Sequence, residues 1–389
     1  MTAPLQNVKV IELARILAGP WIGQTLADLG ADVIKVESPR GDDTRTWGPP
    51  FITDEDGQQS AAYFHSCNRG KRSVTADFTS AEGQAFVRDL VREADVLIEN
   101  FKVGGLKKYG LDYESLKQIN PGLVYCSVTG FGQNGPYAHR AGYDFMIQGM
   151  GGIMDLTGNP QGEPQKIGVA FADIFTGLYG VIGIQAALWR REQTGEGEWV
   201  DMALLDTQVG VLANQAMNYL ASGQSPSRMG NAHPNIVPYQ VFEVADGHLI
   251  LAVGNDGQFK ALCSVLDMPE MAQDPRFATN PTRVENRQVL VPLLEERLKA
   301  YTRDGFLALC EQNGIPAGPI NSVAEALQDP QIAARGMVTT ASGGATAGHD
   351  QRYVRTPITF ANASLALDKA PPKCGEHTKE VQNELSKSR

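Results

Sequence analysis

The residue best placed to do chemistry in this sequence is an aspartate at the start of an apolar helix. The segment GEPQKIGVAFADIFTGLYGVIGIQAALW passes from a loop rich in Gly and Pro into a helical pattern, and Asp173 falls in its opening turn. An aspartate there commonly caps the helix. Because a helix N-terminus favours negative charge and apolar neighbours exclude water, we also expect this carboxylate to stay ionised and to attack a thioester.

Positioning must supply most of the catalytic power of such a carboxylate. The helix dipole contributes only ~0.3–1 kcal/mol. Alignment with a bound thioester supplies ~7–11 kcal/mol, and an aimed oxyanion donor about 3 kcal/mol more. The chain should therefore bind a large thioester carrier such as coenzyme A, whose phosphates, adenine and pantetheine arm need cations, flat apolar contacts and backbone amides.

Three basic stretches next to expected strand ends fit a carrier of this kind. Each cation alone is also typical of a solvated surface patch. The carboxyl ends of strands are, however, where open α/β sheets bind ligands. The residues concerned are Arg69, Lys71 and Arg72 in NRGKRSV, Asn100, Phe101, Lys107 and Lys108 in ENFKVGGLKKYG, and Arg140 and Tyr143 in GPYAHRAGYD.

The first two hundred residues alternate short apolar runs with helical patterns, which indicates βα units and a mainly parallel sheet. Thr79 and Glu82 predict a capping box for a helix with an apolar face formed by Phe86, Val87, Leu90 and Val91. The apolar run Ile174–Trp189 is shorter than the ~20 residues that span a bilayer and predicts a buried helix. Strands are expected at Val8–Leu13, Asp32–Glu37, Ser73–Asp77, Asp95–Glu99, Leu123–Val128 and Trp199–Leu204.

A change of texture after about Ser222 predicts a second, smaller α/β domain. It contains a strand pair split by Asp246-Gly247 and helical stretches near Gln258–Leu266 and Val289–Tyr301. NGIPAGPINSV then leads into a further helix. We expect a large domain over residues 1–222, a small domain over 223–328, and a C-terminal segment, 329–389, that returns to the large domain.

Composition excludes several classes of protein. Among 389 residues, 42% are apolar and the net charge is -10, which argues against a nucleic-acid binder. G-x-G-x-x-G, H-E-x-x-H, G-x-S-x-G and Walker patterns are absent, so nicotinamide, metal and serine-hydrolase chemistry have no support. Five scattered cysteines and the absence of a signal peptide pattern predict a cytoplasmic protein that contacts no membrane.

Taken together, these stretches resemble the family III coenzyme A transferases over nearly the whole chain. The resemblance rests on ARILAGP, GADVIKVESP, NRGKRS, ENFKVGGLKKYGL, SVTGFGQNGPYAHRAGYD, TGNPQGEPQKIGVAFADIFTG and NGIPAGPINSV. It implies a Rossmann-like large domain built from both termini, a smaller domain, and a homodimer of interlocked rings. It also implies no tightly bound cofactor, with coenzyme A thioesters and small carboxylic acids as substrates.

The resemblance also assigns roles to residues. Asp173 would form a mixed anhydride with the donor acyl group, then its own thioester with coenzyme A, then a second anhydride with the acceptor acid. Asn100, Phe101 and Lys108 would contact the coenzyme, and the basic stretch GPYAHRAGYD separately makes Arg140 and Tyr143 candidates for the same contact. Lys71 and Arg72 would lie near its phosphates, and Ala18 beside the thioester.

Departures from the family pattern bear on the substrate. Arg15 and Leu17 stand where formyl-CoA transferases carry histidine and glutamine, so formyl-CoA and oxalate are poor guesses. GDDTRTWGPPF resembles the branch of dicarboxylate enzymes that includes succinyl-CoA:glutarate CoA-transferase, with succinyl-CoA as donor by analogy. Arg15 and Arg45 are candidates for the far carboxylate of the acid, weighed against ordinary ion pairs. The loop Gly230–Tyr239, with Gly230 and Asn231, would shield the anhydride from water.

Two alternatives remain open at this stage. A 2-methylacyl-CoA racemase would use a histidine before the aspartate of AGYD, but that position is Tyr143, followed by Asp144. A tyrosine with a pKa of about 10 is a poor proton shuttle at neutral pH. A non-catalytic acyl-CoA binding protein is the other alternative, and the intact segment around Asp173 argues against it.

Overall fold

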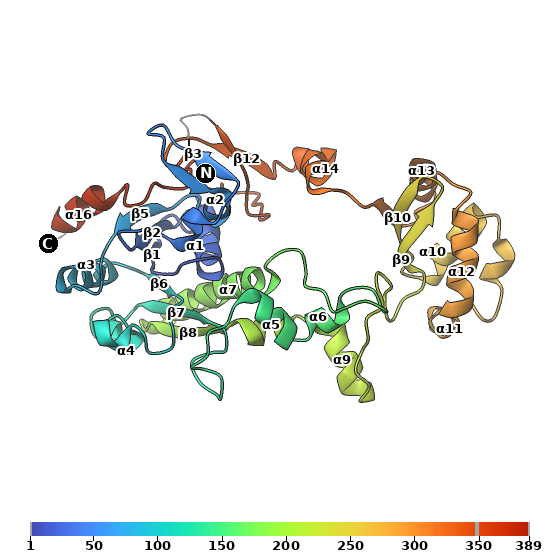
Figure 1. The fold of residues 1–389 in the computed structure, drawn as a ribbon, viewed down its shortest axis with the longest axis horizontal. Coiled ribbons are helices and arrows are strands. Elements are labelled where there is room, and N and C mark those ends of the chain that lie inside the picture. The colour runs from blue at the N-terminus through green and yellow to red at the C-terminus, as the bar shows by residue number, and fades with distance from the viewer. Residues whose placement is uncertain (1, 347–349, 388–389) are drawn as a thin grey trace. The chain divides into compact units, whose positions relative to one another are not determined.

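The computed structural model describes residues 2–346 and 350–387, and it divides into two compact units. The first contains residues 1–153, 166–224 and 330–389, and the second contains 154–165 and 225–329. Figure 1 follows the chain through both units.

The first unit is built on a parallel sheet with the strand order β5-β2-β1-β6-β7-β8. If these six strands are numbered by their order along the chain, their order in the sheet is 3-2-1-4-5-6. In this doubly wound arrangement the first three strands are added toward one edge of the sheet and the last three toward the other. All six strands expected from the sequence are confirmed to within about one or two residues. They are β1 (Lys9–Glu12), β2 (Asp32–Glu37), β5 (Arg72–Thr75), β6 (Val96–Glu99), β7 (Val124–Thr129) and β8 (Glu198–Ala203).

Helices cover both faces of this sheet, because side chains alternate along each strand. On β1, Val10 packs into one core cluster and Ile11 into the other. The helices of the first cluster are α1 (Ala18–Asp28), α5 (Asp144–Met150), α7 (Phe171–Thr194) and α8 (Leu204–Gly210). Those of the second are α3 (Ala81–Arg92), α4 (Tyr113–Lys117) and α16 (Thr378–Lys387).

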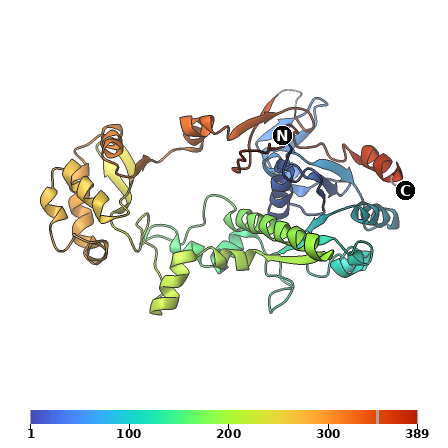
Figure 2. The ribbon, with the colours of Figure 1, turned by 180° about the vertical axis from the view of Figure 1, so that it is seen from behind.

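Helix α7 is the longest helix described, and Figure 2 shows it in green along the sheet. Gly177, Gly180 and Ile184 lie on its buried face, where a Cβ on Gly177 would come within 3.0 Å of the Ala18 carbonyl. The expectation of a buried helix is only half right, because the opposite face exposes Ile182 by 59% and Trp189 by 71%.

By length and composition, α7 could cross a membrane, alone among the helices of residues 2–346 and 350–387. The core helix of a soluble protein passes the same test, so this is weak evidence for a membrane.

The predicted cap of α3 is wrong, although its apolar face is correct. Ser80, rather than Thr79, caps the helix and accepts a hydrogen bond from the Gly83 N–H at 3.1 Å. The Thr79 hydroxyl instead donates to Asp77 at 2.6 Å, in a turn that precedes the helix. A side chain that bonds back to its own turn is unavailable as a cap.

The second unit contains an antiparallel sheet with the order β11-β10-β9 and helices packed around one core cluster. The expected strand pair around Asp246-Gly247 is confirmed, with Val244 paired to Gly247. The expected helices are also present. The elements are β9 (Tyr239–Val244), β10 (Gly247–Ala252), β11 (Ala317–Pro319), α10 (Asp256–Val265), α11 (Asn280–Glu285), α12 (Arg287–Leu298), α13 (Arg303–Gln312) and α14 (Val323–Gln328).

Smaller elements complete the first unit. They are β3 (Phe51–Thr53), β4 (Gln59–Ala61), α2 (Ala62–Cys67), α9 (Ala213–Ser222), α15 (Pro330–Ala334), β12 (Val338–Ala341) and β13 (Gln351–Val354). The C-terminal segment packs on β5 and α1, since the Ser73 N–H donates to His377 and the Thr356 N–H to Asp28.

Candidate active site

A cavity of about 490 Å³ lies where β1, β6 and β7 end. Between β1 and β6 the strand order reverses, which is the crevice where open α/β sheets bind ligands. Segments following all three strands line it, together with the start of α7. Eight of the residues singled out from the sequence meet there, namely Arg15, Ala18, Asn100, Phe101, Lys108, Arg140, Tyr143 and Asp173.

Asp173 lies in the first turn of α7, but it does not cap the helix. The cap position is Ala170, which has no side chain for this purpose. Asp144 takes its place, because its Oδ1 accepts the N–H of Ala172 at 2.8 Å and of Asp173 at 3.3 Å. The helix N-terminus is therefore satisfied by Asp144, and the carboxyl of Asp173 is left to face the cavity.

This arrangement overturns the expectation that the helix keeps Asp173 ionised. Burial, and then the charge of Asp144, raise the pKa of Asp173 to about 7. Tyr63 on α2 has a pKa raised to about 12, first by burial and then by the charge of Asp173, so its phenol is close to the same carboxyl. A carboxylate that gains a proton this readily is a stronger base and a better nucleophile than an exposed aspartate.

A buried amide orients the loop that leads to Asp173. Gln148, one turn after Asp144 on α5, donates to Asp144 at 2.7 Å and accepts the Ile167 N–H at 2.9 Å. Both the cap and the approach to α7 are thus fixed by the same helix, which locks the position of Asp173.

Another part of the lining is the turn after β1, held to the segment after β6 by one side chain. Asn100 Oδ1 accepts the Arg15 N–H at 2.9 Å, and Asn100 Nδ2 donates to the Arg15 carbonyl at 2.6 Å. The Arg15 guanidinium lies 5.6 Å from the centre of the Phe101 ring. Asn100 therefore shapes the cavity wall as well as lining it.

The rim of the cavity is basic although the chain as a whole is acidic. Arg15, Lys102, Lys108 and Arg140 line it and are exposed. Arg140 lies over the Tyr137 ring at 4.7 Å, so part of its side chain is already held. Four cations around one opening suit a ligand that carries several phosphates.

Close packing of two loops shapes the floor of the cavity. A Cβ on Gly130, just after β7, would lie 2.5 Å from the Cα of Gly142. Only residues without a side chain can cross at this distance, so both positions require glycine. The crossing therefore brings the end of β7 next to the residue that precedes Tyr143.

Lys71 does not reach the cavity. Its ammonium is buried, with 1% of the residue exposed, and it bonds to Glu12, the Pro20 carbonyl and Asn68. The expectation that it lies near the phosphates of the coenzyme therefore finds no support within this unit, because a paired, buried ammonium has no donor left for a ligand.

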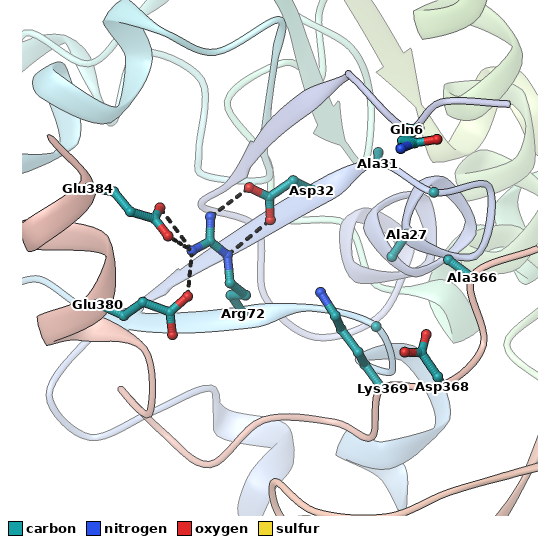
Figure 3. A pocket seen from close by; sticks show the side chains of 12 residues that line it. Gln6, Ala27, Ala31, Asp32, Arg72, Ala366, Asp368, Lys369, Glu380 and Glu384 are labelled. Atoms are coloured by element: carbon teal, nitrogen blue, oxygen red, sulfur yellow. Dashed lines mark hydrogen bonds and ion pairs between the residues drawn. The ribbon is translucent and has the colours of Figure 1, made fainter. Parts of the chain in front are cut away.

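Arg72 is also held elsewhere. It lines a separate cavity of about 420 Å³, where it donates to Asp32 at 2.6 Å, to Glu380 at 3.1 Å and to Glu384 at 2.9 Å (Figure 3). These carboxylates join β2 and α16 to β5, so the visible role of Arg72 is to hold the C-terminal helix.

Arg45 and Arg15 differ sharply as candidates for binding a carboxylate. Arg45 is buried and donates to both oxygens of Glu37, at 2.8 and 2.6 Å, and to the Pro372 carbonyl. Burial would raise the pKa of Glu37, but Arg45 lowers it overall. Arg15 lines the cavity and pairs with Asp43, a contact exposed by about half on both sides. Arg15 can exchange partners at little cost, whereas Arg45 cannot.

Gly230 and Asn231 belong to the second unit. Gly230 has φ of +59°, which glycine adopts without strain, and it begins a turn closed by the bond from Ala232 N–H to the Met229 carbonyl. The His233 N–H donates to the Tyr239 carbonyl, so the loop closes on itself. Its role as a shield stays a prediction.

Sequence reasoning missed several residues of the cavity environment. Asp144 had been noted only for a possible racemase, yet the lack of a capping side chain before Phe171 was a signal that another residue must serve α7. Lys102 adjoins Phe101 and could have been included with the other cations. Nothing in the sequence pattern pointed to Tyr63 or Gln148.

Known proteins share both the sequence and the fold of this chain. The family described as CoA-transferase family III matches residues 5–378. A succinate--glutarate CoA-transferase of Agrobacterium fabrum is 56% identical, covering 98% of this chain and 96% of the relative. A succinyl-CoA:glutarate CoA-transferase of Mus musculus is 41% identical, covering 98% and 86%.

The solved structures agree with the sequence matches. A CAIB/BAIF family protein from Brucella suis has 65% identity and a TM-score of 0.87, covering 99% of this chain and all of that one. With the family match extending over almost every residue, the chain belongs to CoA-transferase family III and is a CoA-transferase that uses acyl-CoA as a substrate.

Proposed function

We propose that this enzyme transfers coenzyme A from succinyl-CoA to glutarate or a similar short dicarboxylate, through covalent intermediates on Asp173. The observation that carries the proposal is a single cavity that holds the Asp173 carboxyl, free of helix capping, together with Asn100, Phe101 and a basic rim. The substrates are those named for relatives at 56% and 41% identity. Against the racemase alternative stands Tyr143, where such an enzyme would use a histidine, and against the non-catalytic alternative stands the Asp173 carboxyl in the cavity.

The first half of the reaction moves the acyl group and then the coenzyme onto the protein. An Asp173 oxygen bonds to the thioester carbonyl carbon, the C–S bond breaks, and the CoA thiolate leaves a mixed anhydride. The thiolate then attacks the aspartyl carbonyl and expels succinate, which leaves Asp173 as a CoA thioester. No proton is gained or lost overall, so the reaction needs a deprotonated carboxylate but no separate acid or base.

The second half runs the same steps with the acceptor. A glutarate oxygen attacks the aspartyl thioester and releases the thiolate, which gives a second anhydride. Attack of the thiolate on the glutaryl carbonyl forms glutaryl-CoA and frees the Asp173 carboxylate. Both anhydrides are easily hydrolysed, so water must be kept away from the cavity. We propose that the loop Gly230–Tyr239 contributes to this shielding.

We assign the coenzyme to the basic side of the cavity and the far carboxylate of the acid to Arg15. Lys102, Lys108 and Arg140 supply charge for phosphates. Asn100 and Phe101 line the same cavity, and Arg15 can release Asp43 to form a bidentate pair with a dicarboxylate.

We also infer a homodimer and a cytoplasmic location. Support for the dimer comes from the exposed apolar residues of α7 and α9, among them Ile182, Trp189, Met217 and Leu220. Light scattering coupled to gel filtration tests this, and a monomeric mass at micromolar concentration would contradict it.

The proposed activity is tested by mixing the enzyme with succinyl-CoA and a panel of short mono- and dicarboxylates, and by following new CoA thioesters by mass spectrometry. We expect glutaryl-CoA to form faster than the thioesters of monocarboxylates. Transfer to monocarboxylates alone would contradict the assignment of substrates, and hydrolysis without transfer would contradict the assignment of reaction.

A further inference from the structure

One wall of the active-site cavity is a strained turn. Arg15, Ile16, Leu17 and Ala18 line the cavity in succession as the chain leaves β1 and enters α1. Ile16 has φ of +75°, in the left-handed region that β-branched residues rarely adopt. Such a turn keeps its shape only if its surroundings hold it.

Side chains from three other segments hold the backbone of this turn. Lys35 donates to the Ala14 carbonyl at 2.9 Å, and Asn100 bonds to both backbone groups of Arg15. Cys67 Sγ donates to the Ile16 carbonyl at 3.6 Å, and Lys71 donates to the Pro20 carbonyl in α1 at 2.9 Å. The turn is thus fixed on both sides of Ile16.

The two lysines form a buried network around Glu12. The Lys35 ammonium donates to Glu12 at 3.0 Å and to the Ala14 carbonyl, and it forms an ion pair with Asp42 at 2.9 Å. The Lys71 ammonium has three acceptors, Glu12 at 2.9 Å, the Pro20 carbonyl and Asn68 at 2.8 Å. Three acceptors match the three N–H donors of the Lys71 ammonium.

This network is an unusual use of charge. The side chains of Glu12, Lys35 and Lys71 are exposed by no more than 1%. A buried ion pair gives little net stability compared with apolar side chains of the same volume, so fixed geometry is the effect that distinguishes it.

Displacement of the turn would be felt at the nucleophile. Ala18 begins α1, and its carbonyl lies against Gly177, one helical turn after Asp173 on α7. A Cβ on Gly177 would come within 3.1 Å of Trp21 as well, so α1 and α7 are closely packed at this point. The close packing of α1 on α7 therefore links the position of the strained turn to that of Asp173.

We propose that Glu12, Lys35 and Lys71 are positioning residues for CoA transfer, which hold the Ile16 turn in its left-handed conformation and so set the position of this cavity wall relative to Asp173. None of the three lines the cavity or touches the reacting atoms. The proposal rests on the proposed role of this cavity, but one of its tests needs no substrate, so the two can fail separately.

The test introduces Lys71→Met into three backgrounds: the parent, Ile16→Gly and Ile16→Ala. Glycine adopts a positive φ without strain, whereas alanine loses the same side chain from the cavity but keeps the Cβ that causes strain. The measurements are kcat and KM for CoA transfer, and amide hydrogen exchange of the peptide covering residues 13–21. Glu12→Gln, which keeps its shape, replaces Lys71→Met if that variant does not fold.

In the parent and in Ile16→Ala, we expect Lys71→Met to lower kcat by roughly 10- to 100-fold, since a misplacement of about 1 Å can cost on the order of 100-fold. KM for the acid should rise as well, because Arg15 belongs to this turn, and exchange should speed up. In Ile16→Gly the loss of kcat should shrink to about threefold or less, because glycine adopts the positive φ of this turn without strain. An equal loss in all three backgrounds, or unchanged exchange in the parent, would overturn the proposal.

Discussion

Asp144 accepts the first N–H groups of α7, and this leaves the carboxyl of Asp173 beside it without a helix end to stabilise its charge. An aspartate in the first turn of a helix would ordinarily have a low pKa, because the helix N-terminus stabilises its charge. Here burial and the charge of Asp144 raise the pKa of Asp173 to about 7. The pair therefore couples the rate of CoA transfer to pH near neutrality.

The rate of transfer should rise with pH through about 7. Only ionised Asp173 attacks the thioester, and its folded-state pKa is about 7, so the carboxyl is protonated and inactive below that value. Asp144→Asn keeps an oxygen for the α7 cap but removes the charge, so the midpoint of the pH profile of kcat/KM should move down. A midpoint that stays in place would show that Asp144 does not tune Asp173.

A second buried carboxyl must be separated from this effect. Burial raises the pKa of Glu99 to about 7, against hydrogen bonds from Ser127 and the Phe101 N–H. Because Glu99 holds the Phe101 backbone but does not line the cavity, Glu99→Gln should leave the midpoint unchanged and alter KM for the CoA thioester by only about two- to threefold. Loss of the midpoint in this variant would assign the titration to Glu99.

Asp173→Asn should abolish transfer and stabilise the protein at alkaline pH. A carboxyl whose folded pKa lies above its unfolded value destabilises the fold increasingly as pH rises from about 4 to about 7. Asparagine cannot ionise, so the gain at pH 8 should be on the order of 2 kcal/mol once partial exposure is discounted. Urea unfolding at pH 8 and pH 5 checks this. A gain that is the same at both values would refute the linkage.

Replacement of Arg15 should change substrate binding, whereas replacement of Arg45 should change stability. Arg15→Ala should raise KM for the dicarboxylate by roughly 10- to 100-fold with little effect on stability, because Arg15 is exposed and its pair with Asp43 is weak. Arg45→Ala should instead cost about 3–5 kcal/mol of stability by leaving the buried Glu37 without its paired guanidinium. Thermal unfolding and steady-state kinetics on both variants decide. An unchanged KM in Arg15→Ala removes its assignment.

Release of the C-terminal helix is the expected effect of Arg72→Met. The guanidinium is mostly buried, but Glu380 and Glu384 are about half exposed, so the global loss should be only about 1–2 kcal/mol. Hydrogen exchange in α16 should nevertheless rise, with affinity for coenzyme A unchanged. A weaker affinity with a protected α16 would restore the assignment of Arg72 to the phosphates of the coenzyme.

Local sequence patterns predicted the strands of the sheet well, but they did not predict the partners of the charged side chains. The strands of the first unit were visible because each is a short apolar run between helical patterns, and Asn100 and Phe101 were found because they follow a strand directly. Lys71, Arg72 and Arg45 looked like a ligand site, since a sequence does not show whether a cation faces a cavity or a buried carboxylate. Glu12 and Asp32, the partners of Lys71 and Arg72, are 59 and 40 residues away in the chain and come together through the parallel sheet, whereas Glu37 is eight residues from Arg45.

The cap of α7 was hidden for the same reason. Asp144 is almost thirty residues before the helix that it caps. The rest of α5, a short helix (Ile153–Leu156) and a loop lie between them in sequence. A helix without a capping residue at its start is a recognisable gap, but what fills it is decided by tertiary packing.

The most direct measurement is chemical trapping on the enzyme itself. The protein is incubated with succinyl-CoA, quenched with hydroxylamine, digested and analysed by mass spectrometry, with Asp173→Asn as the matched control. A hydroxamate at Asp173, absent from the control and dependent on succinyl-CoA, is the predicted result. A hydroxamate at another carboxyl instead of Asp173 would contradict the central claim. CoA transfer by the Asp173→Asn variant at the parent's rate would contradict it as well.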